Sequence, residues 1–399
     1  MAKPILFLAV VLGVFGFAAF GQSAPPAMVF TGTLYTGGIV QNFANGNTKG
    51  LTTMGIWDPV NQVKSRFNLQ GTYNGAGFGL NFRLREDDNW QQMYDSNYPS
   101  FRRLYSWIDI AGGVVRVAAG RLSGYAWATG DAGGFSTFGN LDGAVGMQLQ
   151  VKPIDGLNFG MFVPLTYGAG TNYNPNEDVS EALDSVAFGA KYTIKGMFDV
   201  EGGYWLAPNY AQTWNSSAFY SYPMGWLGAE YIGTPNLTAI LETRIANSSN
   251  TSLNYEYFDE EVAYALDQLT ATLYAEQFIY ASTGAGLGFR PVVDYALGML
   301  DFGAFAQVTY VTSNTFLNLA YSSQLGYSAG PFVKAIFAKN VYMKLQGELG
   351  GGGVCPPTTG APLQSWPGNI GATYQNLGNW QPLPGNSFWQ VYLNFVVSF

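Results

Sequence analysis

The last 13 residues, 387–399, read SFWQVYLNFVVSF and decide the fold. Large apolar side chains occupy every second position from Trp389 to Phe399, whereas Gln390 and Asn394 fall between them. Successive side chains of a β-strand point to opposite faces, so this alternation predicts a strand with one apolar face and one polar face. Any fold for this chain must therefore give the apolar face something apolar to contact.

The same two-residue period recurs through the chain, for example over 78–85 and 341–349. It predicts 18 strands, and one miscounted hairpin would change that number to 16 or 20. The predicted strands lie near 29–40, 64–74, 77–86, 103–111, 113–122, 142–153, 156–166, 183–194, 196–206, 222–232, 236–245, 258–266, 269–280, 287–297, 300–311, 324–337, 340–350 and 387–399.

The connections between these strands alternate between very short and long. The short ones carry Gly, Asn, Asp or Pro, which are typical of tight hairpin turns. They are Asn74-Gly75, Gly112-Gly113, Pro153–Gly156, Lys195-Gly196, Gly233–Asn236, Asp267-Gln268 and Lys339-Asn340. The long ones include 41–63, 87–102, 123–141 and 351–386. This alternation predicts tight turns at one end of the structure and loops at the other, and an even strand number brings both termini to the turn end.

The composition excludes several classes of protein. Only 11% of the residues are charged, against about 25% in a typical soluble domain, and after residue 21 no run approaches the roughly 18–20 apolar residues of a membrane helix. The chain has no His, which excludes Ser-His-Asp hydrolases and His-ligated zinc sites. Its single cysteine, Cys355, lies in a Gly/Pro-rich stretch and is interpreted as an inert loop thiol. We therefore expect no enzyme activity, no metal and no other cofactor.

Residues 1–21 have the features of a secretory signal peptide. Lys3 precedes an apolar run that ends at Phe20, and Ala19 and Gly21 supply the small residues that signal peptidase reads. We expect cleavage after Gly21 and a mature domain over 22–399, with an uncleaved anchor helix as the alternative. Removing Lys3 from a chain of net charge -8 leaves the mature chain at about -9, which argues against nucleic acid as a partner.

The apolar faces of the strands can contact lipid if the sheet closes into a barrel in a bilayer. Lipid then contacts the outward face, water contacts the inward face, and closure leaves no strand edge in the hydrocarbon. The low charge follows, because half of each strand faces lipid. Tyr231, Tyr310, Trp205 and Phe337, near strand ends, are candidates for interfacial aromatic girdles. A soluble secreted β-protein is the alternative, since a sandwich also has one buried face.

With its signal peptide, its alternating strands and its alternating connections, the chain resembles the porin-type β-barrels of Gram-negative-type outer membranes. In that family a C-terminal Phe after alternating apolar residues is the recognition signal for the barrel-insertion machinery. The residues that match this signal are Leu393, Phe395, Val397 and Phe399. The Pro-Glu-Phe-Gly-Gly motif of the trimeric general porins is absent, and Gly133–Gly139 occupies the equivalent loop.

The resemblance implies an all-β fold: a transmembrane antiparallel up-and-down β-barrel of the cell outer membrane, with both termini in the periplasm. It implies outer-membrane lipid, the barrel-insertion machinery and small hydrophilic solutes as partners, and it leaves a homo-oligomer such as a trimer open. No cofactor is implied.

Positions opposite the apolar faces are expected to line the lumen. The basic ones gather on the early strands: Lys64, Arg66, Arg83, Arg85, Arg103 and Arg116. The acidic ones lie on the later strands: Asp199, Glu201, Glu242, Glu261, Glu276, Asp294, Asp301 and Glu348, with Arg244, Arg290, Lys334 and Lys344 among them. These ten basic and eight acidic residues predict a transverse field across a water-filled pore with weak ion selectivity. The alternative is that the charges only solvate the wall and pair with one another.

The expected function is a porin for passive diffusion of small hydrophilic solutes and ions, because about 18 strands leave an aqueous channel. By the resemblance, loop 123–141 folds inward and Asp131 faces the basic arc at a constriction, although this loop could equally remain at the surface. The long loops, above all 351–386, leave a surface adhesin or structural barrel as an alternative. A sugar-selective channel is a further alternative, which rests on aromatic residues of lumen parity: Tyr105, Trp107, Trp226, Tyr274, Phe278, Phe305 and Tyr342.

Overall fold

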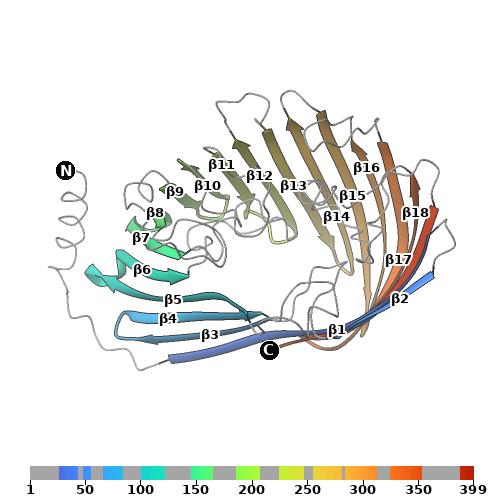
Figure 1. The fold of residues 1–399 in the computed structure, drawn as a ribbon, viewed down its shortest axis with the longest axis horizontal. Coiled ribbons are helices and arrows are strands. Elements are labelled where there is room, and N and C mark those ends of the chain that lie inside the picture. Colours follow the sequence, from blue (N-terminus) through green and yellow to red (C-terminus); the bar gives the residue numbers. More distant parts are fainter. Residues whose placement is uncertain are drawn as a thin grey trace, which may run out of the picture.

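The structure is a computed structural model that describes residues 27–43, 48–54, 66–83, 100–121, 145–164, 186–206, 224–246, 255–280, 284–311, 324–352 and 387–399. These residues form 19 strands of a single antiparallel sheet, which follow one another around a ring in Figure 1. The strands are β1 (Ala27–Phe43), β2 (Thr48–Met54), β3 (Arg66–Tyr73), β4 (Ala76–Arg83), β5 (Ser100–Ile110), β6 (Val115–Arg121), β7 (Val145–Ile154), β8 (Leu157–Pro164), β9 (Ala187–Ile194), β10 (Phe198–Trp205), β11 (Met224–Tyr231), β12 (Leu237–Ala246), β13 (Tyr255–Leu266), β14 (Leu269–Tyr280), β15 (Gly284–Leu297), β16 (Leu300–Val311), β17 (Gln324–Ala338), β18 (Val341–Gly352) and β19 (Ser387–Ser398).

The sheet closes on itself between its first and last strands. β1 pairs with β19 along one edge, while its other edge is shared by β3 and β2, which pair with its first and second halves. The 19 strands therefore fill 18 positions around the barrel, and the predicted 18-stranded antiparallel barrel is confirmed. The prediction was wrong for 41–63, which holds β2 as well as connecting residues. β2 has few apolar side chains, so its strand conformation depends on backbone pairing with β1 and not on an apolar face.

The C-terminal residue completes the closure. The Phe399 and Gly32 backbones exchange two hydrogen bonds of 2.9 Å, one in each direction. On the outward side, the Phe399 ring lies 5.5 Å from the ring of Phe30 and 6.2 Å from that of Phe67, centroid to centroid. The last residue of the chain thus joins both sides of the seam.

Tight turns gather at one end of the barrel, as predicted. Asn74 and Gly75 have φ values of 49° and 73°, the two positive values that a type I′ hairpin turn requires. The antiparallel pairing of β1 with β19 brings the start of β1 and the end of β19 to this same end. At the opposite end β15 begins at Gly284, so residues 281–283 alone connect it to β14, and the prediction of a longer connection there was wrong.

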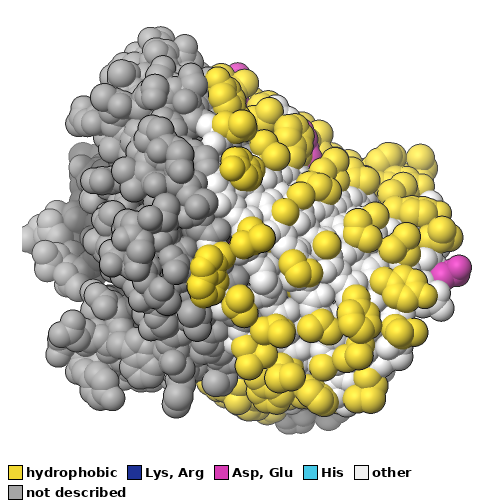
Figure 2. All heavy atoms as spheres, turned by 90° about the vertical axis from the view of Figure 1, so that its right-hand side faces the viewer, with side chains coloured by type: hydrophobic (Ala, Val, Ile, Leu, Met, Phe, Trp, Pro, Cys, Tyr) yellow, Lys and Arg dark blue, Asp and Glu magenta, His cyan; other side chains and the backbone are white. Residues whose placement is uncertain are grey.

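Along each strand, apolar side chains face outward and polar side chains face inward. On β18, for example, Leu345 and Leu349 are exposed on the outer wall, whereas Gln346 and Glu348 are buried on the inner one. Figure 2 shows one side of the barrel with hydrophobic side chains spread across the wall. The described residues include no helix long and apolar enough to cross a bilayer.

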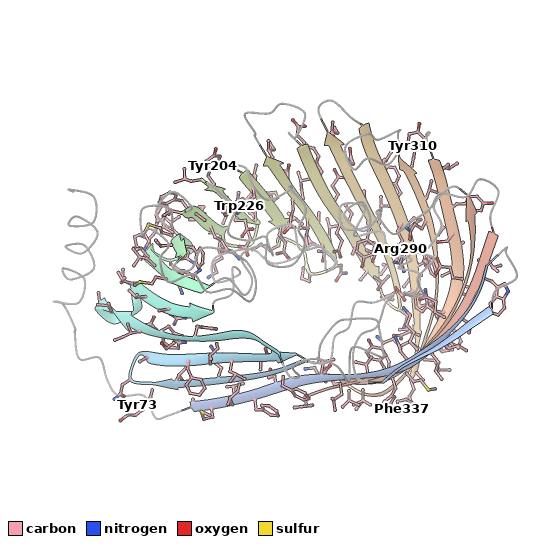
Figure 3. All side chains as sticks on the ribbon, viewed as in Figure 1. Tyr73, Tyr204, Trp226, Arg290, Tyr310 and Phe337 are labelled. Carbon is pink, nitrogen blue, oxygen red and sulfur yellow. The ribbon has the colours of Figure 1, made fainter. Side chains whose placement is uncertain are left out.

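Aromatic side chains mark the outward face near both strand ends. Figure 3 shows Tyr73 and Phe337 on the outside near one end and Tyr204 and Tyr310 on the outside near the other. The side chain of Trp205, another predicted girdle residue, lies outside the described part of the structure.

Candidate channel lining

Basic residues occupy inward positions on β3–β6. Arg66 pairs in register with Arg83, and Arg103 pairs with Asn81. The Arg116 guanidinium donates to both carboxylate oxygens of Asp109, over 2.7 Å and 2.9 Å. The same guanidinium lies 4.0 Å from the centroid of the Trp107 ring, an arrangement that favours a cation–π contact. Arg116 is therefore oriented by two inward side chains of β5.

The bidentate pair between Arg116 and Asp109 predicts a measurable loss of stability when it is broken. Replacing Asp109 with Ala should lower the free energy of unfolding by about 1 kcal/mol, because a charge-assisted pair is strong but this one stays partly open to water. The measurement is the temperature at which the heat-resistant, fast-migrating form disappears in electrophoresis. Asp155→Ala, in an exposed turn, is the matched control, and equal midpoints for the two variants would contradict the prediction.

Acidic residues form a row across the wall on β10–β14. Glu201 pairs in register with Gly228, which pairs with Glu242, then Asp259, then Glu276. Neighbouring strands lie about 4.8 Å apart, so Glu242, Asp259 and Glu276 occupy three adjacent register positions. The side chains of Glu201 and Glu242 are buried. Figure 1 shows these strands across the ring from β3–β6.

The sequence reasoning missed several members of this lining, among them Glu230, which is in register with Asp199. Asp259 completes the row, Asp109 pairs with Arg116, and Lys191 forms an ion pair of 3.0 Å with Asp199. Asp259 was left out although Glu261 was assigned to the lining, and residues two apart in a strand share a face.

On β15–β18 the inward cations pack against aromatic rings. Arg290 lies over Phe305 at 4.7 Å, Lys344 over Phe332 at 4.3 Å and Lys334 over Tyr342 at 4.6 Å. Lys334 also lies 3.8 Å from Asp301. Register places the remaining predicted acidic residues of the lining on the inward face too: Glu261, Asp294 and Glu348. Cations thus alternate with the acidic groups on this side of the barrel.

Several inward aromatic rings lie against the wall, over glycines of the neighbouring strand. Tyr105 is in register with Gly79, Trp107 with Gly77 and Trp226 with Gly203. A Cβ on any of these glycines would overlap the ring beside it. Figure 3 shows Trp226 and Arg290 on the inner side of the wall. The other predicted aromatics also fall on inward positions: Tyr274, Phe278, Phe305 and Tyr342.

Other predicted residues lie on the outer wall or outside the described part of the chain. The C-terminal set of Leu393, Phe395, Val397 and Phe399 is on the outward face of the barrel at the seam. Arg244 is inward by its register with Trp226. Outside the described residues lie Lys64, Arg85, Asp131, Cys355, the signal peptide 1–21 and the loop 123–141.

Comparison with known proteins gives matches among solved structures, while no family model and no curated protein matches the chain. An anion-selective porin from Comamonas acidovorans aligns with a TM-score of 0.51 and 12% identity over 94% of this chain and 100% of its own. OccK2 (OpdF) of Pseudomonas aeruginosa, solved in complex with glucuronate, gives 0.51 and 11% over 93% and 98%. OpdQ of the same organism gives 0.50 and 10% over 93% and 99%.

The likeness at these identities concerns the fold. It extends over 93–94% of this chain and over 98–100% of each solved structure. The apolar outer wall and the charged inner wall agree with a barrel that stands in lipid and surrounds water. The chain therefore has the porin-type β-barrel fold of outer-membrane channels.

Proposed function

We propose that this protein is an outer-membrane porin, a water-filled channel through which small hydrophilic solutes and ions diffuse passively. The observation that carries the proposal is the closed wall with apolar outward positions and charged inward positions on β3–β6 and β10–β18. A barrel of this strand number is wide enough to leave an aqueous channel. The C-terminal residues, with Phe399 at the seam, are proposed as its signal to the barrel-insertion machinery, and residues 1–21 as its cleaved export signal.

The charge arrangement supports a transverse field across the channel. The basic arc consists of Arg66, Arg83, Arg103 and Arg116, and the acid row lies on β10–β14. Such opposed charges orient dipolar solutes and raise the local ion concentration. Because cations on β15–β18 offset part of the acid row, the net ion preference is expected to be weak. Asp131 is proposed to face the basic arc at a constriction.

Planar-bilayer recordings test the channel. Detergent-purified protein should produce discrete conductance steps that rise in proportion to salt concentration, with a small reversal potential in a salt gradient. In liposome swelling, the rate should fall smoothly with solute size. A preparation that is folded by electrophoresis but gives no conductance steps would contradict a porin function.

The inward aromatic rings favour a sugar-selective channel as the second candidate. Rings such as Tyr105 and Trp107 present flat faces on which sugars could stack. Oligosaccharide transport distinguishes the candidates, since a sugar site saturates whereas a general pore shows only a size limit. We expect no saturation, because the rings lie over glycines against the wall and Trp107 and Phe305 already contact cations.

A further inference from the structure

The first residues of β1 extend beyond the end of β19. Gly32 exchanges backbone hydrogen bonds with Phe399 where the pairing of β1 with β19 ends, whereas β3 pairs with β1 from Ala27 onward. Figure 1 shows β1 continuing past the C-terminus. Residues 27–31 therefore have β3 along one edge, and no other strand that the structure describes pairs with their second edge.

This second edge exposes the backbone groups of Met28 and Phe30. Within a strand, successive residues direct their N–H and C=O groups to opposite edges. Gly32 bonds toward β19, so Phe30 and Met28 direct their groups to that same side. Val29 and Thr31 direct theirs toward β3. Met28 and Phe30 therefore each present a backbone donor and acceptor at an open edge, which continues the line of β19.

The side chains beside this edge make it a template for a further strand. Met28 is 63% exposed, Val29 54% and Phe30 58%, so apolar groups are accessible on both faces of the segment. Residues 27–33 contain no charged residue and no Pro, which are common means of keeping another strand away from an edge. The ring of Phe30 lies 5.5 Å from that of Phe399, so an apolar surface stands where the open edge begins.

We propose that residues 27–31 bind an extended peptide segment of another protein, which adds a strand antiparallel to β1 in line with β19. The backbone of this segment bonds Met28 and Phe30, and an apolar side chain opposite Phe30 packs beside the Phe399 ring. The segment is uncharged, because no charged side chain stands on residues 27–33, 67–73 or 395–399. Pairing with β3 puts the edge level with the β3–β4 turn, so the partner lies on the turn side of the membrane.

A second copy of the barrel does not fit this edge. Two copies inserted in the same orientation are related by an axis along the membrane normal, so their β1 strands run in the same sense and cannot pair as antiparallel neighbours. Strands of such barrels are tilted by about 40°, so the two edges would cross instead of lying alongside each other. The edge also points along the wall, toward the place beyond β19, and not outward into lipid. An extended peptide can enter that place, whereas the wall of another barrel cannot.

Amide hydrogen exchange resolved by nuclear magnetic resonance tests whether the edge is open. In detergent-purified protein, the amides of Met28 and Phe30 should exchange about tenfold faster than those of Val29 and Thr31, or faster still. The probe is the peptide acetyl-Lys-Thr-Val-Thr-Val-Thr-Lys-amide, whose terminal lysines serve solubility. It should slow exchange at Met28 and Phe30 and leave Val29 unchanged. Slow exchange at Met28 and Phe30 in the protein alone, or exchange that the peptide does not alter, would overturn the proposal.

A proline variant tests which backbone group binds the peptide. Met28→Pro removes an N–H from the open edge and no bond to β3, so the barrel should keep its heat-modifiable migration. It should weaken the peptide about five- to tenfold in a titration followed at the Phe30 amide, because one backbone hydrogen bond is lost. Met28→Ala retains the N–H and is the matched control, with an affinity within about twofold of the wild type. Equal weakening by Pro and Ala would contradict the proposal. Because neither readout uses conduction, failure here is distinct from failure of the porin function.

Discussion

Replacing Gly77 with Ala is expected to leave almost no folded barrel. A Cβ at this position would lie 2.5 Å from the carbonyl oxygen of Gly71 and 2.5 Å from the Trp107 ring. The ring could turn aside, but the carbonyl belongs to β3, which pairs directly with β4. Overpacking costs about 1–3 kcal/mol, and a collision with backbone that no rotamer relieves belongs at the upper end of that range or beyond it. The yield of heat-modifiable protein in outer-membrane fractions measures the effect.

Two further variants separate the backbone collision from the ring collision. Gly225→Ala is the matched control in a strand, because its nearest neighbours would be 3.7 Å and 3.8 Å away, and it should fold normally. For Gly79→Ala the three nearest atoms all belong to the Tyr105 side chain, with its Cζ at 2.5 Å, so adding Tyr105→Ala should restore folding. Trp107→Ala should not restore Gly77→Ala. A Gly77→Ala protein that folds as well as Gly225→Ala would show that the wall adapts more easily than its geometry implies.

The contacts of these glycines could not be predicted from the sequence. The period-two pattern predicted the strands, and the turn residues predicted which connections are tight, because both signals are local. Whether a glycine lies beneath a ring depends on which residue of the neighbouring strand is opposite it. The register of the two strands decides this. The pairing of Gly77 with Trp107 therefore became visible only when β4 and β5 were aligned.

The prediction of the residues that line the channel was limited in a similar way. Parity predicted inward positions such as Arg116 and Glu242, because each stands in a strand with clear alternation. In the run Asp259–Glu261, where three successive acids break the pattern, it assigned Glu261 to the lining and left Asp259 out. The structure places Asp259 and Glu261 inward and Glu260 outward. Three successive acids therefore stand on alternating faces of β13, and only one of the two inward positions was predicted.

The two-residue pattern of apolar side chains cannot predict a strand that lacks an apolar face. β2 (TKGLTTM) forms only because the second half of β1 offers it an edge. β2 and β3 together occupy the single place beside β1 in the barrel. The number of places around the barrel therefore remains the predicted 18. The count could be predicted because it depends on hairpins, whereas the division of one position depends on a long-range pairing.

Neutralising two members of the acid row is expected to turn the weak ion preference of the channel toward anions. In Glu242→Gln with Asp259→Asn, two adjacent register positions lose their negative charge while each side chain keeps nearly its size. A unit charge about 5 Å from an ion in water contributes just under 1 kcal/mol, so two of them, reduced by salt screening, should change the cation-to-anion permeability ratio by about five- to tenfold. The shift should shrink as the salt concentration rises, because the Debye length shortens.

The matched control removes the same charge from the turn end and not from the lining. Asp155→Asn with Asp267→Asn alters two exposed turns, and Asn suits the positive φ of 51° at position 267. Reversal potentials in a salt gradient compare the two double variants. A field that acts across the pore affects only ions that pass the row, so the turn variant should stay near wild type. If both variants shift equally, net charge rather than its position in the wall sets the preference. If neither shifts, ions do not pass near the acid row, and the transverse field on which the proposed selectivity rests is absent.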